Sequence, residues 1–400
     1  MMRRVYMDAN ATTPLLPEVF EAMRPYFLER FGNASSVHSF GQRARGAVEQ
    51  ARISVAALLH CRPAEIVFTS GGTESDNLAL FGATKPGDHL ITTTIEHHAV
   101  LHAAEQLAKC GREVTFVSVD GNGVVDPDEV RQALRPNTRL ISVMMANNET
   151  GAIQPVEEIA AIAAEVGAQF HTDAVQAAGK LPLNVEKIGC NLLSISGHKM
   201  HAPQGTGVLF VRKDTKIEPL MYGGTHERQR RAGTENLAGI VGLGKAAEIA
   251  SKSLEDGSSQ QIADLRDRLE GEILARVADA GAHARQVPRA PNTTNLWFDH
   301  LEGEALVIAL DMKGLAVSGG SACASGASEP SHVLTAMRVP TERARASLRF
   351  SLSKLTTTED VDFAIEIVPQ AVAKLRELSP FYRKNETFMA NASRVAAVER

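Results

Sequence analysis

The sequence predicts an α/β protein with a mainly parallel β-sheet in a large domain and a smaller α+β domain beside it. Three observations support this fold class. Short apolar runs alternate with helical stretches between residues 45 and 245, which is typical of a parallel sheet covered by helices on both faces. Candidate ligand-binding motifs come directly after several of these runs, where such sheets bind ligands. A chain of 400 residues is too long for one simple core and indicates two or three domains.

The expected strands of the large sheet are apolar runs, several of them separated by amphipathic helices. We expect strands at 65–70, 89–95, 113–119, 139–146, 168–174, 190–196 and 207–212. The expected helices between them include 43–60, 74–84, 98–110 and 155–166.

A polar stretch, EDGSSQ, near residues 255–260 marks the expected end of the large domain. After it we expect, in order, a helix at 261–279, a strand at 292–298, a helix at 302–313, a loop at 318–328, a strand at 345–352 and a helix at 358–377. We therefore assign 14–257 to the large domain, and 1–13 with 258–400 to the small domain. The tail after Pro380 has little periodicity and is expected to be loose.

The composition excludes several classes of protein. Hydrophobic residues make up 44% and charged residues 22%, which is ordinary for a soluble globular chain. Basic residues number 42 against 47 acidic ones, and no basic stripe is visible, so no nucleic-acid partner is expected. No apolar run reaches about 18 residues, so no membrane span is expected. The opening residues carry no apolar run after the arginines, which favours a cytoplasmic protein over a secreted one.

The four cysteines are Cys61, Cys110, Cys190 and Cys323. None forms a CxxC pair, so a disulfide framework, a zinc ribbon and a thioredoxin-type site are poorly supported. The first three are interpreted as buried, inert thiols. Cys323 differs, because residues 318–328 (SGGSACASGAS) have no large side chain to pack and are expected to form an exposed, mobile loop. Its thiol is a candidate nucleophile, with a chance loop thiol as the alternative.

Two strand-end residues are candidates for cofactor chemistry. Lys199 follows the strand at 190–196 and can act as a Schiff-base amine, with Ser196 and His198 placed to donate to a phosphate. Asp173 ends the strand at 168–174, where a carboxylate can pair with the pyridinium nitrogen of pyridoxal 5′-phosphate. Gln176, three residues on, could reach a ring substituent. A surface lysine and an aspartate that caps a helix remain the alternatives.

Two further motifs indicate sites that could bind an anion and contact a flat ring. Residues 69–77 (TSGGTESDN) place glycines and Thr73 at the start of a helix, where free N–H groups favour a phosphate. The pattern is not GxGxxG, so a dinucleotide fingerprint is absent. His97 follows the strand at 89–95 and could lie flat on a ring or move protons. A Gly turn with a helix cap, and a hydrogen-bonded loop histidine, are the alternatives.

Arg349 lies on the strand at 345–352, where apolar and polar residues alternate. The polar face carries this guanidinium, which can hold a carboxylate through two parallel hydrogen bonds. The alternative is an exposed arginine on the sheet.

Two motifs are rejected. Residues 239–245 read G-x-x-x-x-G-K, but Ala246 follows in place of Ser or Thr and the stretch reads as helix, so this is no phosphate loop. His98 and His102 have the spacing of a zinc pair but lack the glutamate of HExxH, so no metal is expected.

Taken together and in order, these motifs resemble the cysteine desulfurases, pyridoxal-phosphate enzymes of the aspartate-aminotransferase fold type (fold type I). The resemblance extends from Asp8 to about Pro380. It is carried by GGTESDN, EHHAV, NNETG, HTDAVQ, SGHK, RRAGTEN, GSACASG and SLRFSLS. The stretches DANATTP, GHKMHAP, RRAGTEN and SEPSHV are most similar to the nitrogen-fixation (NifS) type.

The resemblance implies a role for each candidate residue. Lys199 would bind the cofactor covalently and later act as a base, Asp173 would pair with its ring nitrogen, and His97 would stack on the ring. The other implied cofactor contacts are Gly72, Thr73, Asn148, Gln176, Ser196, His198 and, from the second subunit of a homodimer, Thr234. The implied substrate contacts are Arg349, Asn148 and Asn33. Cys323 would take the sulfur of L-cysteine as a persulfide and leave L-alanine.

The resemblance further implies sulfur delivery to an acceptor scaffold for iron–sulfur assembly, with nitrogenase as the expected user. General iron–sulfur or thio-modification supply stays open. An aminotransferase or a β-lyase on the same scaffold would need Lys199 and Asp173 but not Cys323. A non-catalytic iron–sulfur carrier is disfavoured, because a cluster normally needs four thiolates.

Overall fold

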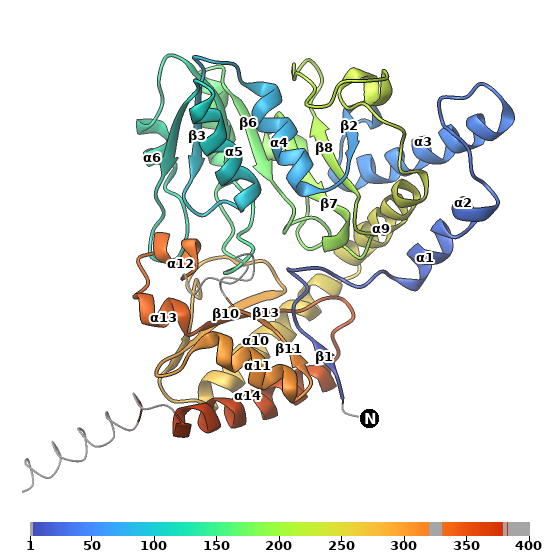
Figure 1. Ribbon diagram of the computed structural model, residues 1–400. Helices are drawn as coiled ribbons and strands as arrows, with labels where there is room; N and C mark the ends of the chain where they lie inside the picture. The colour runs from blue at the N-terminus through green and yellow to red at the C-terminus, as the bar shows by residue number, and fades with distance from the viewer. Residues whose placement is uncertain (1–2, 320–329, 379–381, 383–400) are drawn as a thin grey trace, which may run out of the picture.

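The computed structural model describes residues 3–319, 330–378 and 382 (Figure 1). The large part contains a seven-stranded sheet in the order β2-β8-β7-β6-β5-β3-β4. Its strands are β2 (Ile66–Thr69), β3 (His89–Thr93), β4 (Glu113–Val117), β5 (Thr138–Ser142), β6 (Gln169–Asp173), β7 (Leu192–Ser196) and β8 (Gly207–Val211). β8 runs antiparallel to both of its neighbours, and the other pairs are parallel. The predicted mainly parallel α/β fold is therefore confirmed.

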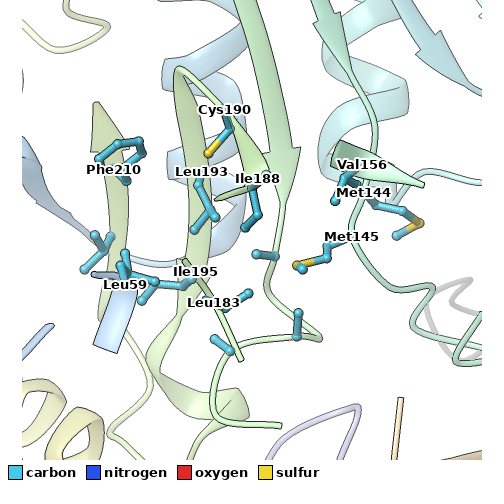
Figure 2. Close-up of a cluster of buried hydrophobic side chains, with 14 of the residues drawn as sticks. Leu59, Met144, Met145, Val156, Leu183, Ile188, Cys190, Leu193, Ile195 and Phe210 are labelled. Atoms are coloured by element: carbon cyan, nitrogen blue, oxygen red, sulfur yellow. The ribbon is translucent and has the colours of Figure 1, made fainter. Parts of the chain in front are cut away.

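Helices cover both faces of this sheet, as the alternation of its strand residues requires. Ile66 and Phe68 enter one core and Val67 enters the other, because successive side chains of a strand point to opposite faces. Figure 2 shows part of the first core, where Leu193 and Ile195 of β7 lie near Phe210 of β8. The longer helices of this part are α3 (Ser39–Leu59), α4 (Gly72–Ala83), α5 (His98–Lys109), α7 (Val156–Glu165) and α9 (Leu237–Glu255). The shorter ones are α1 (Pro17–Met23), α2 (Pro25–Leu28), α6 (Pro127–Gln132) and α8 (Val185–Ile188).

The second part lies below the large sheet in Figure 1 and has a core of its own. Its antiparallel sheet has the order β12 (Ser318–Gly319), β13 (Ser347–Ser351), β10 (Thr293–Phe298), β9 (Ala280–Ala282). Its helices are α10 (Ser258–Arg276), α11 (Gly303–Met312) and α14 (Thr358–Leu378). The short helices α12 (His332–Ala336) and α13 (Thr341–Arg345) lie in the same stretch of chain, but Val333, Leu334 and Ala344 join the core of the large sheet. The N-terminal strand β1 (Val5–Tyr6) pairs with β11 (Leu315–Ala316) in this part. Residues 8–13 then lead from the small part into the large one and pass between the two sheets.

Three local expectations differ from the structure. The helix expected from residue 261 already begins at Ser258, after a tight turn in which Gly257 adopts φ +83° and the Asp256 side chain accepts from the backbone N–H of Ser258 at 2.9 Å. The helix expected to reach residue 279 ends at Arg276, and β9 follows. Cys110 is exposed and Cys61 is partly exposed, whereas Cys190 is buried as expected. None of the described helices is long and apolar enough to cross a membrane.

Candidate active site

A cavity of about 380 Å³ lies where the two sheets and the N-terminal segment meet. Its size suits a small organic ligand. The large sheet contributes residues that end or follow its strands: Gly72, Thr73, His97, Asn148, Asp173, Gln176, Ser196, His198 and Lys199. Arg349 of β13 closes the cavity from the small sheet, and Asn10 and Ala11 come from the N-terminal segment. The predicted crevice beyond the strand ends therefore gathers most of the candidate residues.

Lys199 ends a short turn, Gly197–Lys199, that directly follows β7. A Cβ atom on Gly197 would lie 2.5 Å from the Thr206 hydroxyl, so the tight turn needs glycine there. The Lys199 Nζ donates to the backbone carbonyls of Asn10 and Ala11, both at 2.6 Å. The amine is thus held in the cavity by two neutral acceptors, where it can reach an aldehyde carbon.

Asp173 is the last residue of β6 and is 5% exposed. Its Oδ1 accepts from the backbone N–H of Val175 at 2.8 Å. Burial raises the pKa of this carboxyl to about 6, although the Val175 hydrogen bond and the charge of Lys199 act in the opposite direction. A carboxylate in this setting is stabilised by a cationic partner in the cavity, such as a protonated ring nitrogen.

Asp76 is a second acid of the same cavity, and the sequence analysis missed it. It is 1% exposed, and its Oδ1 has no hydrogen-bond partner within the described residues. His171 Nε2 lies 3.7 Å from this oxygen. Burial raises the pKa of Asp76 well above its ordinary value and lowers the pKa of His171 to about 3. Burial thus disfavours the charged form of both groups. The sequence signal for Asp76 was its position four residues after Gly72, because residues four apart in a helix lie on the same face.

The N-terminus of α4 opens into the cavity with its backbone donors uncapped. Gly71 is the N-cap residue and has no side chain to accept from the first turn. A Cβ on Gly72 would lie 2.7 Å from Val175 Cγ2, and a Cβ on Gly207 would lie 2.5 Å from Gly71 Cα. These glycines let the strand and the helix start approach closely, which leaves N–H groups and the positive helix end available to an anion.

His97 is the N-cap residue of α5 and presents its ring to the cavity. Its Nδ1 accepts from the backbone N–H of Ala99 at 3.1 Å. The proton of the neutral ring therefore sits on Nε2. Burial, followed by the charge of Lys199, lowers the pKa of His97 to about 4. The ring is thus a flat, uncharged surface near neutral pH.

Arg349 is buried, at 5% exposure, because the N-terminal segment covers the polar face of β13. Its Nη2 pairs with Asp8 Oδ1 at 2.7 Å, and its Nη1 donates to the Asn148 carbonyl at 3.1 Å. The Arg349 Nε and the Asn148 Oδ1 are both buried without a hydrogen-bond partner within the described part of the chain. An unsatisfied donor and acceptor beside a cavity indicate where a polar ligand binds. The alternative of an exposed sheet arginine is wrong.

Three predicted residues are not among those that line this cavity. Asn33 is exposed in the segment between α2 and α3, where its Oδ1 accepts from the Ser35 N–H at 2.8 Å. Thr234 lines a separate cavity of about 120 Å³, together with Thr206. Cys323 lies outside the described residues.

The rejected motifs can also be placed. Residues 239–245 lie inside α9, as expected for a helix. The rings of His98 and His102 stack at a centroid distance of 4.9 Å. The described ranges hold no group of three His, Cys, Asp or Glu side chains arranged to bind a metal ion.

The residues around the cavity fit pyridoxal 5′-phosphate. An amine, a buried carboxylate, a flat neutral imidazole and an uncapped helix N-terminus meet in one cavity, and they match the aldehyde, ring nitrogen, ring face and phosphate of that group. The Arg349 Nε and the Asn148 Oδ1, which have no hydrogen-bond partner among the described residues, belong to two further residues that line this cavity.

Comparisons with known proteins agree with this arrangement. Residues 5–363 match the family model described as aminotransferase class-V. The chain is 47% identical over 385 residues to the protein named cysteine desulfurase IscS of Dictyoglomus turgidum, covering 95% of this chain and 98% of that one. A solved structure titled NifS-like protein superposes with a TM-score of 0.86 at 37% identity, covering 93% of this chain and all of that one. Another, titled SspA in complex with cysteine, has a TM-score of 0.77 at 35% identity and covers 88% of this chain and all of that one.

Proposed function

The chain belongs to the cysteine desulfurases of the class-V aminotransferase family, and on this premise we propose that its cavity binds pyridoxal 5′-phosphate and converts L-cysteine to L-alanine and transferable sulfur. One observation carries the proposal: Lys199, Asp173 and Arg349 reach a single cavity from both sheets. Their groups are those that hold the cofactor aldehyde, its ring nitrogen and a substrate carboxylate.

Each group in the cavity has a binding task in this proposal. Lys199 binds the cofactor covalently, Asp173 pairs with the ring nitrogen, and His97 covers the ring. Gly72 and Thr73 at the start of α4 would hold the phosphate, with Ser196 and His198 as further donors, and Gln176 and Asn148 would contact the ring oxygen or the substrate. When bound, the cofactor withdraws electrons from the Cα atom of the amino acid attached to it.

The residues of the chain itself orient the substrate and move protons. Arg349 and the side chain of Asn148 hold the carboxylate of cysteine, which fixes the direction of its Cα–H bond. Lys199 takes the Cα proton as base, and the carbonyls of Asn10 and Ala11 are placed to accept from the resulting ammonium. The cavity is part-enclosed by both sheets, so these transfers occur away from bulk water.

Cys323 is the proposed sulfur acceptor. Its thiolate forms an S–S bond to the substrate sulfur while the Cβ–S bond of the substrate breaks. The electron pair of that bond stays with Cβ, which takes up a proton and becomes the methyl group of alanine. Cys323 then carries the persulfide. The small-residue context of 318–328 in the sequence supports this role.

The test measures alanine and sulfide together in single variants. Cys323→Ser is expected to bind the cofactor and to lose sulfide release in the presence of a reductant almost completely. Cys110→Ser is the matched control, because Cys110 is a free, exposed thiol that has no role in the proposed reaction. If Cys323→Ser makes both products at the wild-type rate, a β-lyase that releases sulfide directly replaces the desulfurase.

We also propose that two copies of the chain form the working enzyme. Large apolar side chains are exposed on α1 to α3 and on the segment before residue 223: Phe20, Phe27, Leu28, Phe31, Val37, Phe40, Ile53, Leu220, Met221 and Tyr222. A surface of this kind is typical of a protein interface. Asn33 and Thr234 are both exposed, so both are available to the active site of the second copy. A monomer that is fully active at nanomolar concentration would contradict this.

The proposal also covers the protein that accepts the sulfur and the use of that sulfur. We propose an iron–sulfur scaffold protein as acceptor and nitrogenase cluster assembly as its use, on the strength of the NifS-type motifs alone. Action in the cytoplasm suits a thiol that must stay reduced between turnovers. We further propose that the two sheets belong to two domains, which comprise residues 14–257 and residues 1–13 with 258–400. Loss of nitrogenase activity on deletion, without loss of other iron–sulfur enzymes, is the expected result.

A further inference from the structure

Lys180 is a second lysine close to the proposed active site, and the scheme above gives it no task. It lies in the turn that follows β6, four residues after Gln176. Its Nζ donates to Gln176 Oε1 at 2.7 Å and to Asn10 Oδ1 at 3.3 Å. It is partly buried and lines a small cavity of about 50 Å³ next to Lys199. Burial lowers its pKa to about 7, with the charges of Lys199 and Arg349 as further causes.

The contacts of Lys180 determine which way two amide side chains face. While Lys180 is protonated, its ammonium group has donors and no acceptor, so the amide atoms nearest to it are the oxygens. The amide nitrogen of Gln176 must therefore face the other way, where it donates to the backbone carbonyl of Asn10 at 3.0 Å. For Asn10 the same orientation is also imposed by Asn292, whose Nδ2 donates to Asn10 Oδ1 at 3.0 Å.

The carbonyl of Asn10 places the Gln176 amide next to the reactive amine. This one oxygen accepts from Gln176 Nε2 at 3.0 Å and from Lys199 Nζ at 2.6 Å. Gln176 also lines the main cavity. A reversed amide would place its oxygen against the Asn10 carbonyl and would present an acceptor, instead of a donor, beside Lys199.

We propose that Lys180 is a positioning residue that holds the amide of Gln176 with its N–H group toward Lys199, so that the cavity offers a hydrogen-bond donor to the anionic ring oxygen of the bound cofactor. The inference rests on the proposed function. It concerns how one donor is oriented, and Lys180 itself touches neither cofactor nor substrate in this account.

The test uses Lys180→Met, which keeps the length of the side chain and removes its donors. The dissociation constant of pyridoxal 5′-phosphate from the protein is expected to rise about tenfold, the effect of one lost charge-assisted hydrogen bond. The apparent pKa of the absorbance of the bound cofactor is expected to move upward by about one unit, because a donor to its anionic oxygen is lost. Lys180→Arg keeps a donor-only cation, so its dissociation constant and its apparent pKa are both expected to match those of the wild type.

Two comparisons separate positioning from a general effect. Lys354→Met is the matched control, because Lys354 lines the same small cavity but donates to Ser253 Oγ at 3.2 Å. It should leave both values unchanged. In a Gln176→Ala background, Lys180→Met should add no further shift, because the amide through which it acts is gone.

Equal shifts from Lys180→Met with and without Gln176 would overturn the proposal and make Lys180 a plain electrostatic neighbour. Unchanged binding and absorbance in Lys180→Met would overturn it as well. A wild-type protein that binds no pyridoxal 5′-phosphate would instead refute the proposed function, so the two failures are distinguishable.

Discussion

Replacement of Arg349 by lysine tests how the cavity holds its substrate. The arginine uses Nη2 for Asp8 and Nη1 for the Asn148 carbonyl, and its buried Nε has no hydrogen-bond partner in the described part of the chain. Lysine carries its three donors on one nitrogen at the end of a flexible chain, so it lacks the planar fork with which the guanidinium reaches separate partners from separate nitrogens. The carboxylate of cysteine should therefore lose one charge-assisted hydrogen bond.

The size of this loss follows from the contact that is removed. A hydrogen bond to a charged group contributes about 1.5–3 kcal/mol. At about 1.4 kcal/mol for each factor of ten, kcat/KM for cysteine should fall roughly 10- to 150-fold. Cofactor affinity should change less than twofold or so, because Arg349 lies on the small sheet and the expected phosphate site lies at the start of α4 on the large one.

The assay compares steady-state alanine formation with cofactor binding in the same preparations. Arg343→Lys is the control, because Arg343 also makes two side-chain hydrogen bonds, both to Asp299, at 3.1 and 2.8 Å, but does not line the cavity. It should leave kcat/KM unchanged. The reasoning fails if Arg349→Lys behaves like this control, or if it weakens the cofactor as much as the substrate.

Four other outcomes are expected. Lys199→Ala should abolish turnover and the visible absorbance of the bound cofactor; a coloured, active variant would contradict its role. Asp173→Asn keeps the shape but not the charge, and it should stop alanine formation nearly as completely as Asp173→Ala. Arg52→Met leaves a buried carboxylate without its partner at 2.8 Å and should lower the free energy of unfolding by about 3–5 kcal/mol in urea melts. Burial lowers the pKa of His171 to about 3 from 6.5, so below pH 6.5 the unfolded chain binds a proton that the folded chain does not. The free energy of unfolding should therefore fall by about 1.4 kcal/mol for each unit by which the pH is lowered below 6.5, because of this residue. This part of the fall should be absent in His171→Asn.

Some of the site could not be read from spacing along the chain. Asn10 is the clearest case: its side chain donates to Asn148 carbonyl and to Thr293 Oγ1, at 3.0 and 2.8 Å. These partners are more than a hundred residues away in sequence, so no local pattern marks them. Asp76 was missed for a different reason, since it sits inside a helix that reads as an ordinary amphipathic segment and its function depends on what faces it.

The sequence by itself determined the fold class, the strand order along the chain and most of the chemical groups of the site. Local rules suffice for these, because the period of apolar residues defines each element and parallel strands present their carboxyl ends on one side. Only the tertiary structure decided that β8 runs antiparallel, that the segment at 8–13 passes between the sheets, and that Arg349 is buried against Asp8. Such pairings depend on close packing between residues far apart in the chain, where burial and hydrogen bonding select one partner among many and the local sequence expresses no preference.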